Sequence, residues 1–284
     1  MIYTKDGYII TNYHVVGKDT KSIKVTLSDG TQYEGAFIYG DEYSDISVIK
    51  INKNDCVPAK IGSSAQIWVL DETIAIGNSL GLGIRATYGV ISALACDVTV
   101  ENLTMNLMST DAGINSGNSG GGLFNARGEL IGIVNAKIGG TSVESMGYAI
   151  PIDAVVKCVN DMNRYGYVTG KARLGVTVQT KTYQSWPYLQ TYTLLQIAGI
   201  NPNGSAASSG MQVDDILQKL GDTEISSFED LQRLLTKYEV GDTVTLTVRR
   251  PTIDYTGSNL SEYLNSCEEV KLEVTFVEFN PNVS

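Results

Sequence analysis

Basic residues and histidine are scarce in this sequence of 284 residues. Lysine and arginine number 21 against 31 aspartates and glutamates, and the formal net charge is −10. This balance argues against binding to nucleic acid, because a phosphate backbone requires clustered Lys and Arg side chains. No basic run is long enough to indicate an anionic membrane surface. No stretch approaches the roughly 18 apolar residues of a membrane-spanning helix, and the polar start shows no signal peptide.

Cysteine and histidine are also too few for a metal cluster. Cys56, Cys96, Cys158 and Cys267 form no C-x-x-C pair, and His14 is the single histidine of the chain. We therefore predict no zinc site, no other cofactor and no disulfide framework. Cys158 lies on the apolar face of a predicted helix, so we expect it to be a small core residue.

The first half of the chain has the pattern of an all-β domain. Ile23, Val25 and Leu27 alternate with polar residues, which is the period of a half-buried strand. Many short strands with glycine-rich turns between them favour a sandwich or a pair of barrels. The strands are predicted at residues 23–27, 33–38, 45–51, 73–77, 87–94, 104–110, 121–125, 130–138 and 146–150.

A helix that begins at Pro151 and ends at Gly166 separates this half from a mixed α+β part. We predict a first domain at 1–165, a linker at 166–172 and a second domain at 173–284. A second helix is predicted at 227–238, where Ser226 and Glu229 fit an S-x-x-E capping box. The remaining elements are strands at 174–179, 192–200, 214–220, 243–250 and 268–279 and a short helix at 204–209.

Three residues, in chain order, have the side chains of a catalytic triad. His14 lies in the run Thr-Asn-Tyr-His-Val-Val, Asp45 opens an apolar run, and Ser119 lies in Gly-Asn-Ser-Gly-Gly. A serine hydroxyl becomes nucleophilic when a base takes its proton, and the base needs an anion to orient it. Each residue alone has a plainer interpretation: a packed histidine, a turn aspartate and a glycine-rich loop. Their joint order and context favour nucleophilic catalysis.

Five stretches that include these residues resemble the HtrA/Deg family of trypsin-fold serine proteases. They span residues 11–16, 45–51, 77–81, 110–121 and 147–151, and the stretch around Ser119 is the most specific. Residues 173–176, 201–217 and 226–249 resemble a PDZ domain as found in bacterial proteases of this kind. The resemblance implies a mainly β fold: a chymotrypsin-like double β-barrel followed by an α+β PDZ domain.

The same resemblance assigns roles to residues. Asp45 would orient His14, His14 would take the proton from Ser119, and backbone N–H groups of Gly117, Asn118 and Ser119 would form the oxyanion hole. The floor of the specificity pocket maps onto Gly113, and with Ile114 and Ala136 it indicates small or aliphatic side chains. In the PDZ domain, backbone groups of residues 173–176 (Arg173, Leu174, Gly175 and Val176) would receive a peptide carboxylate.

The sequence also departs from the family pattern. Val213-Asp214-Asp215 stands where Pro-Gly-Asp is usual, Gly122 replaces a proline, and residues 251–267 look like an insertion with no clear role. Lys5-Asp6-Gly7 is a hairpin-turn signal with only a short partner before it. Family members carry further residues here, preceded by a signal or anchor, so we expect an amino-terminally truncated chain.

Two functions of different classes remain open at this point. The first is a serine endopeptidase that cuts misfolded or exposed polypeptides, with a PDZ domain that binds peptide C-termini. The second is a catalytically silent peptide-binding or chaperone-like module, because a truncated first barrel could displace His14. The resemblance further implies an extracytoplasmic location and a possible homotrimer.

Overall fold

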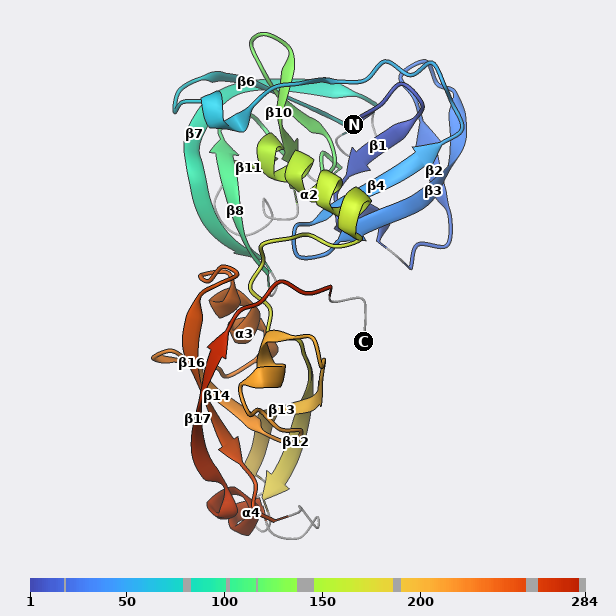
Figure 1. Ribbon diagram of the computed structural model, residues 1–284. Helices are drawn as coiled ribbons and strands as arrows, with labels where there is room; N and C mark the ends of the chain where they lie inside the picture. The colour runs from blue at the N-terminus through green and yellow to red at the C-terminus, as the bar shows by residue number, and fades with distance from the viewer. Residues whose placement is uncertain are drawn as a thin grey trace. The chain divides into compact units, whose positions relative to one another are not determined.

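The computed structural model describes residues 1–17, 19–78, 83–100, 103–115, 117–136, 146–185, 190–253 and 260–280. The chain divides into two compact units (Figure 1). The first comprises Met1–Val100 and Met105–Val168, and the division from the second falls between Val168 and Thr169. No helix in the described ranges is long and apolar enough to cross a membrane.

The first unit begins with a four-stranded antiparallel sheet in the order β1-β4-β3-β2. Its strands are β1 (Tyr8–Thr11), β2 (Ile23–Thr26), β3 (Gln32–Asp41) and β4 (Ile46–Ile51). Ahead of β1, Ile2 forms an isolated bridge with Ile9, and the N–H of Gly7 donates to the carbonyl of Thr4 over 3.2 Å. Gly7 has φ +95°, a conformation that glycine adopts without strain. The predicted turn at residues 5–7 is therefore present.

A second sheet closes on itself. Its order is β11-β8-β7-β6-β9-β10-β5, and β10 also pairs with β11, so six of its strands form a ring. The two ends of an ordinary sheet are absent from such a barrel. The strands are β5 (Lys60–Ile61), β6 (Glu72–Gly77), β7 (Arg85–Val100), β8 (Leu103–Thr110), β9 (Gly122–Asn125), β10 (Glu129–Val134) and β11 (Gly147–Pro151).

Helix α2 (Ile152–Tyr165) lies between the two sheets and helps to close their common core (Figure 1). One cluster joins Ile10 and Val48 of the first sheet, Leu107 and Ile133 of the barrel, and buried Cys158 of the helix. The helix ends where Gly166, at φ +80°, donates its N–H to the carbonyl of Met162. Both the helix and the core position of Cys158 match the sequence-based prediction.

The second unit contains one antiparallel sheet in the order β12-β13-β14-β16-β17, with β15 paired to β14. The strands are β12 (Val176–Ser185), β13 (Gln190–Ile200), β14 (Ile216–Leu220), β15 (Thr223–Glu224), β16 (Thr243–Arg250) and β17 (Glu268–Thr275). Helix α3 (Phe228–Leu235) packs Leu231 and Leu234 into its core. Helix α4 (Leu260–Ser266) lies in the predicted insertion, near the far ends of β12 and β13 (Figure 1).

Several predicted boundaries are wrong by a few residues. The N-cap of α3 is Ser227, whose hydroxyl accepts from the N–H of Asp230 over 3.1 Å, while Asp230 accepts from the N–H of Ser226. The N-cap is thus Ser227, one residue later than predicted, and the return bond goes to the N–H of Ser226 and not to that of the N-cap. Helix α3 ends at Leu235 instead of residue 238, and β17 ends at Thr275 instead of residue 279. The last two residues of the strand predicted at 130–138 lie outside the described ranges.

Candidate active site

His14 lies on the one-turn helix α1 (Tyr13–Val16), which begins two residues after the end of β1. Two bonds anchor this turn to the residue before β4. The N–H of Tyr13 and the side-chain amide of Asn12 both donate to the backbone carbonyl of Asp45, each over 3.1 Å. Asn12 is fully buried, so the start of α1 is fixed against the first sheet.

Asp45 and His14 are joined by a backbone bond and a side-chain contact. The N–H of His14 donates to Oδ1 of Asp45 over 2.9 Å, and Nδ1 of His14 lies 2.7 Å from Oδ2. The Asp45 side chain is only 7% exposed, and its backbone has φ 50°, the left-handed region that few residues other than glycine adopt. Strained backbone at a polar site persists where surrounding contacts impose it, and such strain is common at functional sites.

Asn135 is a third partner of Asp45 that no sequence motif singled out. Its side-chain amide donates to Oδ2 of Asp45 over 2.9 Å, and Asn135 is fully buried at the end of β10. Oδ2 thus faces both the amide and the imidazole. Hydrogen bonds to the charged form of a carboxyl group stabilise that form. The amide and the imidazole together fix the Asp45 side chain in position.

Ser119 contacts the residue that follows Asn135. The backbone N–H of Ala136 donates to Oγ of Ser119 over 3.1 Å. Consecutive residues therefore contact the two groups: Asn135 bonds to Asp45, and Ala136 bonds to Ser119. Among the described residues, no hydrogen bond joins the Ser119 hydroxyl to the His14 ring.

The glycines around Ser119 permit close crossings of the backbone. A Cβ atom on Gly120 would lie 2.2 Å from Oγ1 of Thr11 in β1, and one on Gly121 would lie 2.4 Å from the carbonyl oxygen of Ile76 in β6. Any side chain at these positions would force the loop away from both sheets. The Gly-Asn-Ser-Gly-Gly sequence thus places Ser119 where strands of the two sheets come close.

The loop before Ser119 offers unbonded backbone donors. Gly117 has φ +94°, and within the described residues neither its N–H nor that of Ser119 has an acceptor. The N–H of Asn118 instead donates to the carbonyl of Asn115 over 3.0 Å. Asn118 is 6% exposed, and its Oδ1 atom is buried without a partner.

The three residues predicted to line the specificity pocket have different surroundings. The carbonyl of Gly113 accepts from the hydroxyl of Thr87 over 2.9 Å. Ile114 packs against the core of the closed barrel, where a Cβ on Gly147 would lie 2.5 Å from its Cδ1. Ala136 is 8% exposed and, through its N–H, contacts Ser119. Of the three, Ala136 is the one with a described bond to Ser119.

The predicted carboxylate cradle lies in the second unit, at the start of β12. Gly175 has φ +73°, and a Cβ there would lie 2.6 Å from Cα of Gly204. The carbonyls of Leu174 and Gly175 accept from the N–H groups of Ala206 and Asn201, each over 2.8 Å. In the described part of the chain, the N–H groups of Leu174 and Gly175 have no acceptor. Val176 begins β12, and Arg173 precedes the loop.

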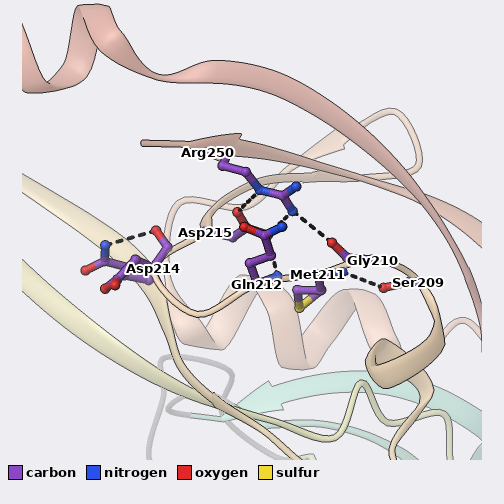
Figure 2. Close-up of polar contacts among 8 residues, drawn as sticks. Ser209, Gly210, Met211, Gln212, Asp214, Asp215 and Arg250 are labelled. Carbon is purple, nitrogen blue, oxygen red and sulfur yellow. Dashed lines mark hydrogen bonds and ion pairs between the residues drawn. The ribbon is translucent and has the colours of Figure 1, made fainter. Parts of the chain in front are cut away.

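An ion pair with a fully buried carboxylate supports the segment that leads into β14 (Figure 2). The guanidinium of Arg250 donates to both carboxylate oxygens of Asp215, each over 2.8 Å, and to the carbonyl of Gly210 over 2.9 Å. Asp215 is fully buried, and its hydrogen bond and charge raise the pKa of Arg250 further above the usual range. Asp214 beside it has φ 74°, which explains why glycine is usual at this position of the pattern.

Comparisons with known proteins agree with both units. A family described as "Trypsin-like peptidase domain" matches residues 1–133, and one described as "PDZ domain" matches residues 172–261. "Serine endoprotease DegS" of Haemophilus influenzae is 33% identical over 254 residues, covering 88% of this chain and 72% of its own length. The chain belongs to the HtrA family of serine proteases. The resemblance and the fold class predicted from the sequence are thereby confirmed.

Other relatives of this HtrA-family chain are longer. "Serine protease Do-like HtrA" of Lactococcus lactis subsp. lactis is 34% identical over 88% of this chain, which spans 66% of that relative. "Periplasmic serine endoprotease DegP" of Escherichia coli is 37% identical over 86% of this chain, which spans 52% of it. A solved structure described as "HtrA-type protease AlgW with decapeptide" has a TM-score of 0.61 and 28% identity, covering 99% of this chain and 82% of that one.

Proposed function

We propose that this chain is a serine endopeptidase that uses Ser119 as nucleophile, His14 as base and Asp45 as the orienting anion. The observation that carries the proposal is the pair of contacts made by consecutive residues at the end of β10. Asn135 bonds to the carboxylate that holds His14, and Ala136 bonds to the hydroxyl of Ser119. These contacts support a single site built from three separate stretches of the chain.

The proposed reaction follows from the hydrogen bonds. Asp45 accepts from Nδ1 of His14, which leaves Nε2 free to take a proton. The Ser119 side chain first rotates away from Ala136 toward His14. Its Oγ then attacks the peptide carbonyl carbon, and the Oγ proton passes to Nε2 of His14. His14 then protonates the leaving amine. Water hydrolyses the acyl-enzyme in a second step with the same base.

The oxyanion of each tetrahedral intermediate needs hydrogen-bond donors with no other acceptor. The N–H groups of Gly117 and Ser119 meet this requirement in the described structure. The N–H of Asn118 is already bonded to Asn115, so we assign the role to the other two. Loss of one such donor costs about 3 kcal/mol in transition-state stabilisation.

For the second unit we propose the capture of peptide C-termini by the loop of Leu174, Gly175 and Val176. The N–H groups of Leu174 and Gly175, which have no acceptor in the described residues, are suited to a carboxylate, and the peptide would add a strand to β12. Two solved structures of the HtrA-type protease AlgW contain, by their descriptions, a decapeptide and a tripeptide. We further propose misfolded or exposed polypeptides as substrates, an extracytoplasmic location like that of the relatives named periplasmic, and a homotrimer.

One observation favours the silent alternative. Oγ of Ser119 is bonded to the N–H of Ala136, and within the described residues it has no bond to His14. A hydroxyl that stayed there would not be activated. The chain would then be a peptide-binding module that retains the triad residues without the reaction.

Labelling with a fluorophosphonate probe distinguishes the two functions. We expect the wild type to be labelled, and Ser119→Ala and His14→Ala to show no labelling while they retain wild-type circular dichroism. Because triad members act as a unit, the two variants should lose activity to a similar extent. A well-folded wild type that takes up no probe would support the silent module, and labelling of Ser119→Ala would refute the assigned nucleophile.

A further inference from the structure

Strand β12 is an outer strand of its sheet and is paired to β13 along its whole length. It contains ten residues, Val176–Ser185, and every one of them has a partner in β13. On its other side, none of the described strands pairs with it. In an antiparallel pair, alternate residues point their N–H and C=O groups away from the partner, so an outer strand presents a row of free backbone groups.

The free edge is longer than a short peptide requires. Ten residues of strand extend over about 33 Å, and a tetrapeptide covers only about 13 Å of that length. The proposed carboxylate cradle, at Leu174 to Val176, lies at the beginning of the strand. A tetrapeptide seated there would leave more than half of the edge unpaired.

The two halves of β12 pack into different hydrophobic clusters, on opposite faces of the strand. Val176 and Val178 pack on the cluster that contains Leu231 and Leu234 of α3. Tyr183, an odd number of residues further on, points to the other face, because successive side chains alternate along a strand. It is 7% exposed and packs against helix α4, which lies at this end of the sheet (Figure 1).

Helix α4 contacts Tyr183 in the far half of β12 and is anchored to β13 and β16. Leu260 and Tyr263 are each 4% exposed, and the rings of Tyr263 and Tyr183 lie 6.0 Å apart. The side-chain amide of Gln196 in β13, 2% exposed, donates to the hydroxyl of Tyr263 over 3.2 Å. Burial raises the pKa of Tyr263 to about 12, so this hydroxyl stays neutral. The guanidinium of Arg249 in β16 also donates to the carbonyl of Leu264.

These contacts matter because a two-stranded hairpin without support is marginally stable in water. A frayed edge would have to be ordered by its ligand, and the ordering would cost binding free energy. Helix α4 packs on Tyr183, in the far half of β12, and is therefore placed to support this part of the edge. We expect this packing to keep the far half of β12 in the strand conformation before a peptide binds.

We propose that this PDZ unit binds an extended polypeptide C-terminus of about eight residues or more along the whole edge of β12. The proposal rests on the peptide capture proposed above and specifies its ligand: an unfolded chain end, paired through its backbone, and not the last three or four residues alone. Recognition would be by main-chain hydrogen bonds upstream, so many sequences would bind, provided that proline is absent where an N–H must face β12.

The test uses the full chain with the Ser119→Ala substitution, so that peptides are not cut. A library of fluorescent decapeptides, with six fixed upstream residues (Thr-Gln repeated three times) and four random C-terminal residues, yields the tightest binder. This peptide is then shortened by removing residues from its amino end. The forms of eight, six and four residues are titrated against the protein. We expect Kd to rise at least tenfold between the eight-residue and four-residue forms, because several backbone hydrogen bonds are lost.

N-methylation of this decapeptide tests the pairing without changing the protein. One peptide carries methyl groups on the fifth and seventh amides from the carboxyl end, and a second carries them on the sixth and eighth. Only one of the two sets points toward β12, so we expect one peptide to bind as weakly as the tetrapeptide and the other to bind as the parent does. If both methylated peptides bound the protein as tightly as the unmethylated decapeptide, the proposal would be overturned.

Two variants then test the role of α4. Tyr263→Ala should abolish the advantage of the long peptide and leave the affinity of the tetrapeptide unchanged. Ile253→Ala, an exposed change in the same insertion, should alter neither. Equal affinities of the wild type for four and ten residues would overturn the extended edge while peptide capture stands. Failure of any library member to bind folded protein would overturn peptide capture itself, and the present proposal with it.

Discussion

The backbone N–H of Ala136 donates to Oγ of Ser119 over 3.1 Å, in the residue directly after the one that bonds to Asp45. The end of β10 therefore contacts both the anion and the hydroxyl of the candidate triad. A small shift of this strand end would change both contacts, and with them the position of Ser119 relative to Asp45. Catalysis by this site would be sensitive to such a shift, since misplacement by about 1 Å can cost ~100-fold in rate.

Asn135→Ala should lower kcat/KM for a peptide substrate by about tenfold, because it removes one hydrogen bond to a charged, buried carboxylate. The loss should fall mainly on kcat, since Asn135 acts through Asp45 and His14 and not on the substrate. Asn106→Ala removes an exposed amide that bonds to Asp97, and should leave the kinetics unchanged. Wild-type kinetics in Asn135→Ala would show that Asp45 needs no support from β10.

Gly175→Val should weaken the binding of C-terminal peptides and spare the cleavage of a small chromogenic substrate. The new side chain would combine a positive φ with a Cβ 2.6 Å from Gly204, so the loop must move. Gly199→Ala is the matched control, because its Cβ would have no neighbour closer than 3.7 Å and its φ is ordinary. Peptide affinity by fluorescence anisotropy decides, and an unchanged Kd in Gly175→Val would refute the cradle.

Leu70→Gly should stabilise the first unit by about 0.5–1 kcal/mol. Leu70 has φ 76° and is 73% exposed, so it carries backbone strain of about 1–2 kcal/mol with little packing in return. The neighbouring exposed Val69 has no positive φ, and Val69→Gly should destabilise the unit through chain entropy alone. Urea unfolding measures both, and the prediction fails if the two substitutions shift stability in the same direction.

Arg250→Met should destabilise the second unit by about 3 kcal/mol, because it leaves the buried carboxylate of Asp215 without its cation. Arg233→Met breaks a similar pair with Asp230 that is partly exposed, and should cost less than about 1 kcal/mol. Differential scanning calorimetry of the full chain would compare the two. Similar losses in both variants would mean that burial of Asp215 adds nothing to the pair.

Glu129 should make the first unit depend on pH in acid. Hydrogen bonds from Asn125, Lys60 and Arg127 lower the pKa of Glu129 from 4.5 to about 2. A carboxyl group with a lowered folded-state pKa contributes stability above its unfolded pKa, and that stability is lost as the pH falls from 4.5 toward 2. Glu129→Gln should therefore lose stability at pH 6 and differ less from the wild type at pH 3.

The control for this charge change is Glu34→Gln, on an exposed position of β3. Its difference in urea midpoint from the wild type should be small and should not follow the same pH profile. If the Glu129→Gln difference were the same at pH 3 and pH 6, the carboxylate would not be the group that couples stability to pH.

Much of the first unit could be predicted from local pattern. The alternation at Ile23 to Leu27 and the stop at Gly166 depend on neighbours in sequence, and both elements are present. The order of His14, Asp45 and Ser119 pointed to one site because the combination is rare. The bonds at Asn135 could not be foreseen, since they depend on the strand pairing that closes the barrel.

The second unit shows where such reasoning stops. The capping box could be placed at either of two adjacent serines, and the choice of Ser227 depends on the backbone entering the helix in an extended conformation. No motif in the insertion at 251–267 indicated a role, because α4 packs against Tyr183 and Ile216, which are far away in sequence. Contacts between distant segments carry no local periodicity, so they leave no signal in a window of residues.

The short contact between Nδ1 of His14 and Oδ2 of Asp45 also makes a spectroscopic probe of this protein. Because the chain has no other imidazole, selective ¹⁵N labelling of histidine would give two ring-nitrogen resonances, and both would come from this site. Their chemical shifts report which nitrogen carries the proton, without any sequential assignment. The response of the candidate triad to inhibitors, peptides or acid could then be followed in the intact protein.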